Sequence, residues 1–152
     1  MIRVVDVAHI MFNVTDLERS LKLYRDILGF KVSGEYEGDV IWLNMGQYRE
    51  GHNLAFHDIG LYKVPHALPD NARKRVGLNH AAFRLATAAD VDRAAELLKA
   101  SGVKILKGPL THKEDKDRYL YFEDPDGNVL ELVATTLPDF PDGFLAPERR
   151  SA

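Results

Sequence analysis

The chain has 152 residues, with 20 Lys plus Arg, 23 Asp plus Glu, six His and no Cys. A chain of this length buries about 68–70% of its unfolded surface in one domain, so it needs neither a metal nor a disulfide to fold. The lack of cysteine excludes disulfides, thiolate metal sites and cysteine nucleophiles. Any metal must therefore be bound by histidines and carboxylates.

The formal net charge of −3 gives no basic surface for nucleic acid. No apolar run approaches the ~20 residues that span a membrane, and the first ten residues lack the apolar centre and cleavage site of a signal peptide. We therefore expect a cytoplasmic protein without nucleic-acid or membrane partners.

The first half of the chain predicts a strand, a helix and three further strands. Residues 3–12 are rich in β-branched and apolar side chains, and Thr15 with Glu18 forms a predicted capping box for a helix that ends at Gly29. Extended chain is expected over residues 30–32, 40–45 and 54–64, with a turn over residues 34–38.

The second half repeats this order. A strand is expected over residues 77–85 and a helix from Thr87 and Asp90 to Gly102, with its buried stripe formed by Val91, Ala94, Ala95 and Leu98. A strand over residues 103–106 and a hairpin over residues 118–133 follow, the hairpin turning at residues 124–128.

The two halves superimpose as βαβββ modules, with His9 equivalent to His80, 71 residues later. The sequence thus predicts one α+β domain over residues 1–152. The expected parts are a first module over about 4–65, a linker over 66–75, a second module over about 76–135 and an irregular tail over 136–152.

Two histidines and one glutamate form a candidate metal site. His9 and His80 stand at equivalent positions of the repeat and can face one cleft, and Glu131 lies in an apolar run, where a carboxylate without a cation is costly. Two His and one carboxylate form the facial triad of Fe(II) oxygenases, which leaves about three of six octahedral positions open. The alternative, that each is an ordinary hydrogen-bonded structural residue, stays open at this point.

The predicted hairpin places Tyr121 opposite Glu131 on one face of the sheet. Tyr121 would then stand beside the metal. A bulge in the turn would break this register, Tyr119 has the same strand parity, and a packing role for Tyr121 remains open.

Taken together, these residues resemble the vicinal oxygen chelate superfamily of glyoxalases, fosfomycin and bleomycin resistance proteins, epimerases and type I extradiol dioxygenases. The resemblance covers nearly all of residues 4–134. It implies two paired βαβββ modules that form a cupped mixed sheet around a metal, with His9, His80 and Glu131 as ligands. Residues 121–131 resemble the signature that ends in the metal-binding glutamate.

Three features resemble the single-domain extradiol dioxygenases in particular. His57 begins a segment, residues 57–62, similar to the strand that carries the acid–base histidine of those enzymes. His112 follows Gly108-Pro109 as does the histidine that contacts a catecholic oxygen, and Tyr121 lies ten residues before Glu131, as does the substrate-binding tyrosine.

The resemblance implies ring cleavage of a catecholic diol by O₂. His57, Tyr121 and His112 would be catalytic, the metal would be Fe(II), with Mn(II) or another divalent ion as the alternative, and the protein would be a homodimer.

Two other functions fit the same superfamily. A glyoxalase-type lyase or epimerase holds its metal with four protein ligands, and here Gly60 stands where the fourth carboxylate is expected. If that strand is shifted in register, His57 becomes the fourth ligand. The third function, a metal-free protein that sequesters a small molecule, gives no reason to keep three ligand-type residues.

Overall fold

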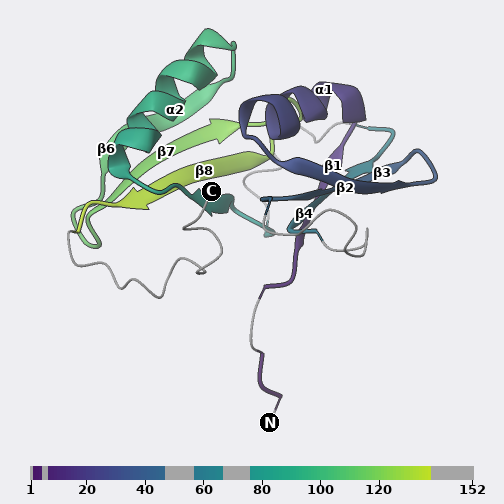
Figure 1. Ribbon diagram of the computed structural model, residues 1–152, viewed down its shortest axis with the longest axis horizontal. Coiled ribbons are helices and arrows are strands. Elements are labelled where there is room, and N and C mark those ends of the chain that lie inside the picture. Colours follow the sequence, from purple (N-terminus) through teal and green to yellow (C-terminus); the bar gives the residue numbers. More distant parts are fainter. Residues whose placement is uncertain (1, 5–6, 47–56, 67–75, 138–152) are drawn as a thin grey trace. The chain divides into compact units, whose positions relative to one another are not determined.

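The computed structural model describes residues 2–4, 7–46, 57–66 and 76–137. The chain forms two compact units, Met1–Ala67 and Leu68–Ala152, each of which is a four-stranded mixed sheet with helical segments (Figure 1). The predicted α+β fold of two βαβββ modules is confirmed.

The first unit contains four strands in the order β1-β4-β3-β2. The parallel pair is β1 with β4, and the other neighbours are antiparallel. Its elements are β1 (Ile10–Val14), α1 (Leu17–Leu21), η1 (a π-helix, Lys22–Ile27), β2 (Lys31–Tyr36), β3 (Val40–Asn44) and β4 (Ile59–Lys63).

The second unit repeats this topology in the order β5-β8-β7-β6, with β5 parallel to β8. The predicted repeat is kept to the residue, since Ile10 pairs with Ile59 in the first unit and Ala81 with Leu130 in the second. Its elements are β5 (Ala81–Arg84), α2 (Ala88–Ala100), β6 (Ile105–Thr111), β7 (Asp117–Glu123) and β8 (Val129–Thr135).

Each unit has its own hydrophobic core. In the second unit, Val91, Ala95 and Leu98 of α2 are buried, whereas Ala94 of the predicted stripe is half-buried, and α2 contacts β6, β7 and β8. Strand alternation points every second side chain toward this helix. The buried strand residues on that face include Leu120, Phe122, Leu130, Leu132 and Ala134. The opposite side of the sheet, which carries Tyr119, Tyr121 and Glu131, is called the open face below.

The predicted start of α2 at Thr87 was right, and the capping box predicted for α1 was wrong. Thr87 and Asp90 form the reciprocal capping box of α2. The N-cap of α1 is Asp16, not Thr15, because the Asp16 carboxylate accepts the hydrogen bond from the backbone N–H of Arg19. Thr15 instead accepts a hydrogen bond from the Arg19 guanidinium.

Several predicted boundaries shift because a strand needs a partner. β1 begins at Ile10 rather than at residue 3, since its pairing with β4 begins there. β2 continues to Tyr36 where a turn was expected, and β6 continues from the predicted residue 106 to Thr111, because each pairs with its antiparallel neighbour past a bulge. Residues 54–56 of the predicted third strand, the linker from residue 67 and the tail from residue 138 lie outside the described residues.

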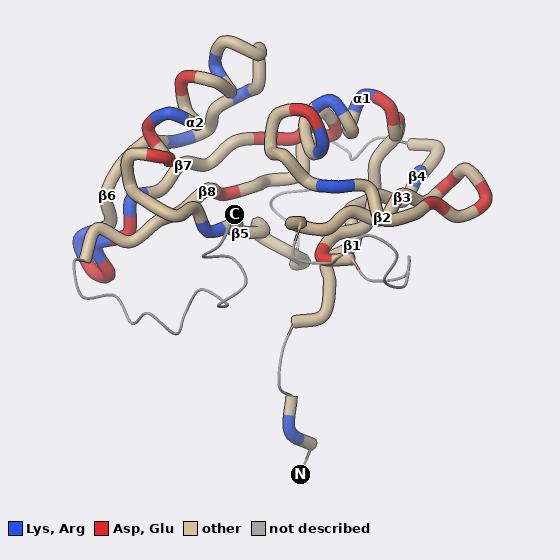
Figure 2. The backbone as a smooth tube through the Cα atoms, in the orientation of Figure 1, with Lys and Arg blue, Asp and Glu red and all other residues tan. Residues whose placement is uncertain are grey.

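Charged residues of both signs are interspersed along both units, as the near-neutral composition predicts (Figure 2). Within the described ranges, no helix is long and apolar enough to cross a membrane.

We predict that Gly108→Ala destabilises the protein by about 2–4 kcal/mol, because residue 108 has φ of 96° and a Cβ there would lie 2.6 Å from the backbone oxygen of Tyr119. Gly102→Ala is the matched control, since its φ is 74° but no atom lies within 4 Å, and it should cost only about 1 kcal/mol. Urea unfolding measures both. Equal costs would show that the close backbone approach at Gly108 is unimportant.

Candidate functional site

Glu131 is the buried carboxylate around which the polar residues of the second unit gather. It lies on β8, between β5 and β7, and only 6% of its surface is exposed. Tyr121 of β7 is directly opposite it, which confirms the predicted register. Ala82 on the other side and Lys107 beyond Tyr121 complete one row across the open face.

His80 lies beside Glu131, with Nε2 2.9 Å from Oε2. Its Nδ1 is 2.7 Å from Asn79 Oδ1, so Nε2 is the ring nitrogen that faces Glu131. Ligand atoms about 2.1 Å from one divalent ion in adjacent octahedral positions lie about 3 Å apart. The spacing of Nε2 and Oε2 therefore fits two ligands of one metal ion.

Tyr121 contacts both members of this pair. Its ring meets the His80 ring edge-on, with centroids 5.0 Å apart. Burial raises the pKa of Tyr121, and the negative charge of Glu131 and a hydrogen bond to it raise that pKa further. The phenol is thus held in its neutral form, which can donate a hydrogen bond to an oxygen of a bound molecule.

His112 is held by Tyr119 on the same unit. The two rings are stacked, with centroids 3.8 Å apart and an interplanar angle of 14°. Tyr119 is 4% exposed and also contacts Tyr121 at 5.4 Å between centroids. Tyr119 was not among the predicted site residues. The strand parity that it shares with Tyr121 was the available signal, but parity alone could not show a stack with a loop histidine.

The first unit brings His9 and His57 together. Their ring centroids lie 4.4 Å apart, and the ring of Trp42 stacks on His57 at 5.7 Å with an interplanar angle of 20°. His9 directly precedes β1, and His57 precedes β4, the strand that pairs with β1. The place of Trp42 opposite Gly60 follows only from the strand register.

Gly60 occupies the position equivalent to Glu131. Gly60 pairs with Met11 and Trp42, just as Glu131 pairs with Ala82 and Tyr121. A Cβ at residue 60 would lie 2.2 Å from Met11 Sδ. The first unit therefore offers a thioether and an indole where the second offers a carboxylate and a phenol.

The predicted ligands fall into two groups, His9 in the first unit and His80 with Glu131 in the second. Within the ranges that the structure describes, no three histidine or acidic side chains form a complete metal-binding cluster. The joining of His9 with His80 and Glu131 around one ion stays a prediction. Of the two remaining histidines, His52 lies outside the described residues and His66 is exposed.

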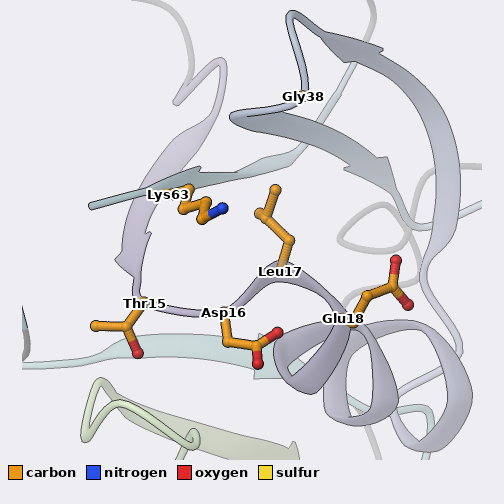
Figure 3. A pocket seen from close by; sticks show the side chains of 6 residues that line it. All are labelled: Thr15, Asp16, Leu17, Glu18, Gly38 and Lys63. Carbon is orange, nitrogen blue, oxygen red and sulfur yellow. The ribbon is translucent and has the colours of Figure 1, made fainter. Parts of the chain in front are cut away.

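A surface pocket of the first unit lies away from these residues (Figure 3). The lining residues of this pocket are Thr15, Asp16, Leu17, Glu18, Gly38 and Lys63. One of them, Asp16, is also the N-cap of α1. None of the predicted site residues belongs to this pocket.

Comparison with curated proteins gives relatives with different activities. The chain is 33% identical over 143 residues to the metallothiol transferase FosB of Staphylococcus epidermidis, covering 90% of this chain and 86% of that protein. It is 32% identical over 110 residues to biphenyl-2,3-diol 1,2-dioxygenase 2 of Rhodococcus globerulus, covering 68% of this chain and 53% of that protein.

Solved structures share the fold. A glyoxalase/dioxygenase from Nostoc punctiforme matches with a TM-score of 0.67 and 25% identity, covering 87% of this chain and 92% of that one. The fosfomycin resistance protein FosX of Listeria monocytogenes, complexed with Mn(II) and sulfate, matches with a TM-score of 0.66 and 23% identity, covering 89% and 94%.

These relatives are enzymes that carry out different reactions, and they do not select one reaction for this chain. The family model described as the Glyoxalase/Bleomycin resistance protein/Dioxygenase superfamily matches residues 6–132. Because this match spans most of the chain and both units, the protein belongs to the Glyoxalase/Bleomycin resistance protein/Dioxygenase superfamily.

Proposed function

We propose that this protein is a metal-dependent extradiol dioxygenase, which uses O₂ to cleave a catecholic ring beside its two hydroxyl groups. The observation that carries the proposal is the row on β7 and β8. It sets the neutral phenol of Tyr121 directly beside the pair of candidate ligands, His80 and Glu131. A diol that chelates a metal at this place would find a hydrogen-bond donor, Tyr121, beside its oxygens.

His9, His80 and Glu131 would hold the metal, with Fe(II) as the proposed ion and Mn(II) as the alternative. A bound metal would be chelated by both oxygens of the diol and would let electrons pass from the diol to O₂. The protein ligands would contribute two neutral nitrogens and one negative charge. A divalent ion would thus keep a positive charge that attracts the diol anion.

The other residues of the second unit would orient the substrate. Tyr121 would donate its hydrogen bond to one diol oxygen, because its raised pKa keeps the proton on the phenol. The stack on Tyr119 fixes the plane of the His112 ring, so this imidazole can meet the diol from a defined direction.

His57 is proposed to move the protons. It would accept the proton of a diol hydroxyl and return a proton as the O–O bond breaks, a role suited to an imidazole, whose nitrogens can both accept and donate a proton. Its ring is stacked on Trp42 and lies beside His9, so it would stand next to a metal ligand with its orientation fixed.

A glyoxalase-type lyase or epimerase is the less favoured function. Such an enzyme would need a fourth protein ligand at the position equivalent to Glu131. That position is Gly60, and the sulfur of Met11 occupies the space where its side chain would begin. The pairing of β4 with β1 fixes this position, which argues against the shifted register that would make His57 the fourth ligand.

A metallothiol transferase is the second candidate, favoured by the 33% identity with FosB over 90% of this chain. It would use the same metal ligands and would transfer a thiol without O₂. The homodimer and the cytoplasmic location that the sequence suggested remain part of the proposal.

Ring cleavage is tested by adding Fe(II) under nitrogen, then air and a panel of catechols. We expect O₂ uptake and a yellow ring-fission product. Glu131→Gln should abolish metal binding, measured by calorimetry, and activity with it, whereas Glu96→Gln on the exposed surface of α2 should change neither. Thiol transfer to an electrophile without O₂ uptake would establish the transferase instead.

His57→Ala separates a proton carrier from a fourth ligand. The variant should bind Fe(II) with unchanged affinity and lose about 10²–10⁴-fold in kcat, the usual contribution of general acid–base catalysis. His66→Ala, at an exposed position, is the control. Loss of metal binding in His57→Ala would make His57 a ligand and would favour the lyase.

The alkaline titration of tyrosine tests the environment of Tyr121. In metal-free protein, the phenol of Tyr121 should ionise at higher pH than an ordinary tyrosine, because its pKa is raised by burial and by Glu131. Absorbance at 295 nm should show that Tyr121→Phe removes a late-titrating group. Glu131→Gln should move that group to lower pH, and Tyr36→Phe, at a position that is 55% exposed, should leave it in place. A late group that survives Tyr121→Phe would contradict this assignment.

A further inference from the structure

We propose that Lys107 is a specificity-determining residue that binds a carboxylate on the substrate, so that the preferred substrate is an aromatic diol with an anionic substituent. This inference rests on the proposed function, because it places the diol at Glu131 and Tyr121. It goes beyond that function in naming the substrate class.

Two independent observations place Lys107 on the open face. The register sets it opposite Tyr121 across β6 and β7, while Ile105, before the bulge, is opposite Phe122 of the core. Its Nζ also lies 5.4 Å from the ring centroid of Tyr119, which shares a face with Tyr121. The ammonium is therefore held over the aromatic pair beside the candidate ligands rather than directed away from them.

Three other cations of the second unit are ion-paired, whereas the Lys107 ammonium contacts an aromatic ring. Arg84, Lys104 and Arg118 of the same unit each have a carboxylate partner, at 3.4 Å from Asp117, 3.2 Å from Glu123 and 2.5 Å from Asp92, respectively. Among the residues that the structure describes, Lys107 has no carboxylate partner. Its ammonium is available to an anion, while Glu131 would be compensated by the metal.

The spacing suits one small molecule. Glu131 and Lys107 are separated by two strand intervals in the row through Tyr121, about 10 Å between backbones, and the long lysine side chain can shorten that distance. A diol held beside Glu131 and Tyr121 would extend a substituent along the row toward β6. In the first unit, the equivalent row is Met11, Gly60, Trp42 and Gly34, which carries no charge.

The test compares 3,4-dihydroxyphenylacetate with uncharged 4-methylcatechol. We expect kcat/KM of the native protein to favour the carboxylate, and Lys107→Met to lower its kcat/KM about fivefold with little change for 4-methylcatechol, as for a partly exposed ion pair. Lys107→Arg should restore most of the preference. Lys99→Met, an exposed lysine of α2, is the matched control for net charge and should have no effect.

Binding of both diols to the Fe(II)-loaded protein under nitrogen, measured by calorimetry, separates the two proposals. Charge-selective binding that Lys107→Met removes, without ring cleavage, would overturn only the dioxygenase. Ring cleavage of both diols without a preference, or an equal loss for both in Lys107→Met, would overturn only the carboxylate site, since Lys107 would then merely support Tyr119. If neither diol binds, both proposals are overturned.

Discussion

Glu131 is a carboxylate on a strand with neighbours on both sides, and compensation of its charge determines what surrounds it. Its burial is costly unless a cation or hydrogen-bond donors approach. His80 Nε2 lies 2.9 Å from one of its oxygens, and Tyr121 of β7 lies directly opposite it. These neighbours place two ligand-type atoms, His80 Nε2 and Glu131 Oε2, side by side, with the neutral phenol of Tyr121 next to them. The residues that stabilise the carboxylate are thus the residues that a metal-dependent reaction on a diol would use.

The two units use one topology for different purposes. The parallel and antiparallel pairings are equivalent, but the row through Glu131, Tyr121 and Lys107 is polar, while the row through Gly60, Trp42 and Gly34 is not. An internal repeat needs only the core-facing residues to stay apolar, so the open-face residues are free to diverge. In the proposed enzyme, the second unit would bind the diol and the first would contribute His9 and the proton carrier His57.

The sequence also explains why closely related chains can differ in reaction. The superfamily relatives include a metallothiol transferase and a diol dioxygenase, and the predicted ligand residues by themselves fit either. Residues outside the ligand set, such as Tyr121, His112 and Lys107, would then decide which molecule is bound and oriented. This is the expected result when a common metal centre is combined with variable neighbours.

Local patterns in the sequence determined the βαβββ repeat, the Thr87–Asp90 cap and the register of Tyr121 with Glu131, because each depends on residues close in the chain or on one hairpin. The cap at Asp16 and the start of β1 at Ile10 were not predictable, since side-chain geometry and pairing with a distant strand decide them. The repeat and the apolar run around Glu131 indicated the candidate ligands, and the resemblance to a family added the expected roles of His57 and His112. Only the tertiary structure decided that Tyr119 stacks on His112, that Trp42 stacks on His57 and that the Lys107 ammonium lies over Tyr119. These contacts join different strands and loops through side-chain rotamers, which no local pattern specifies.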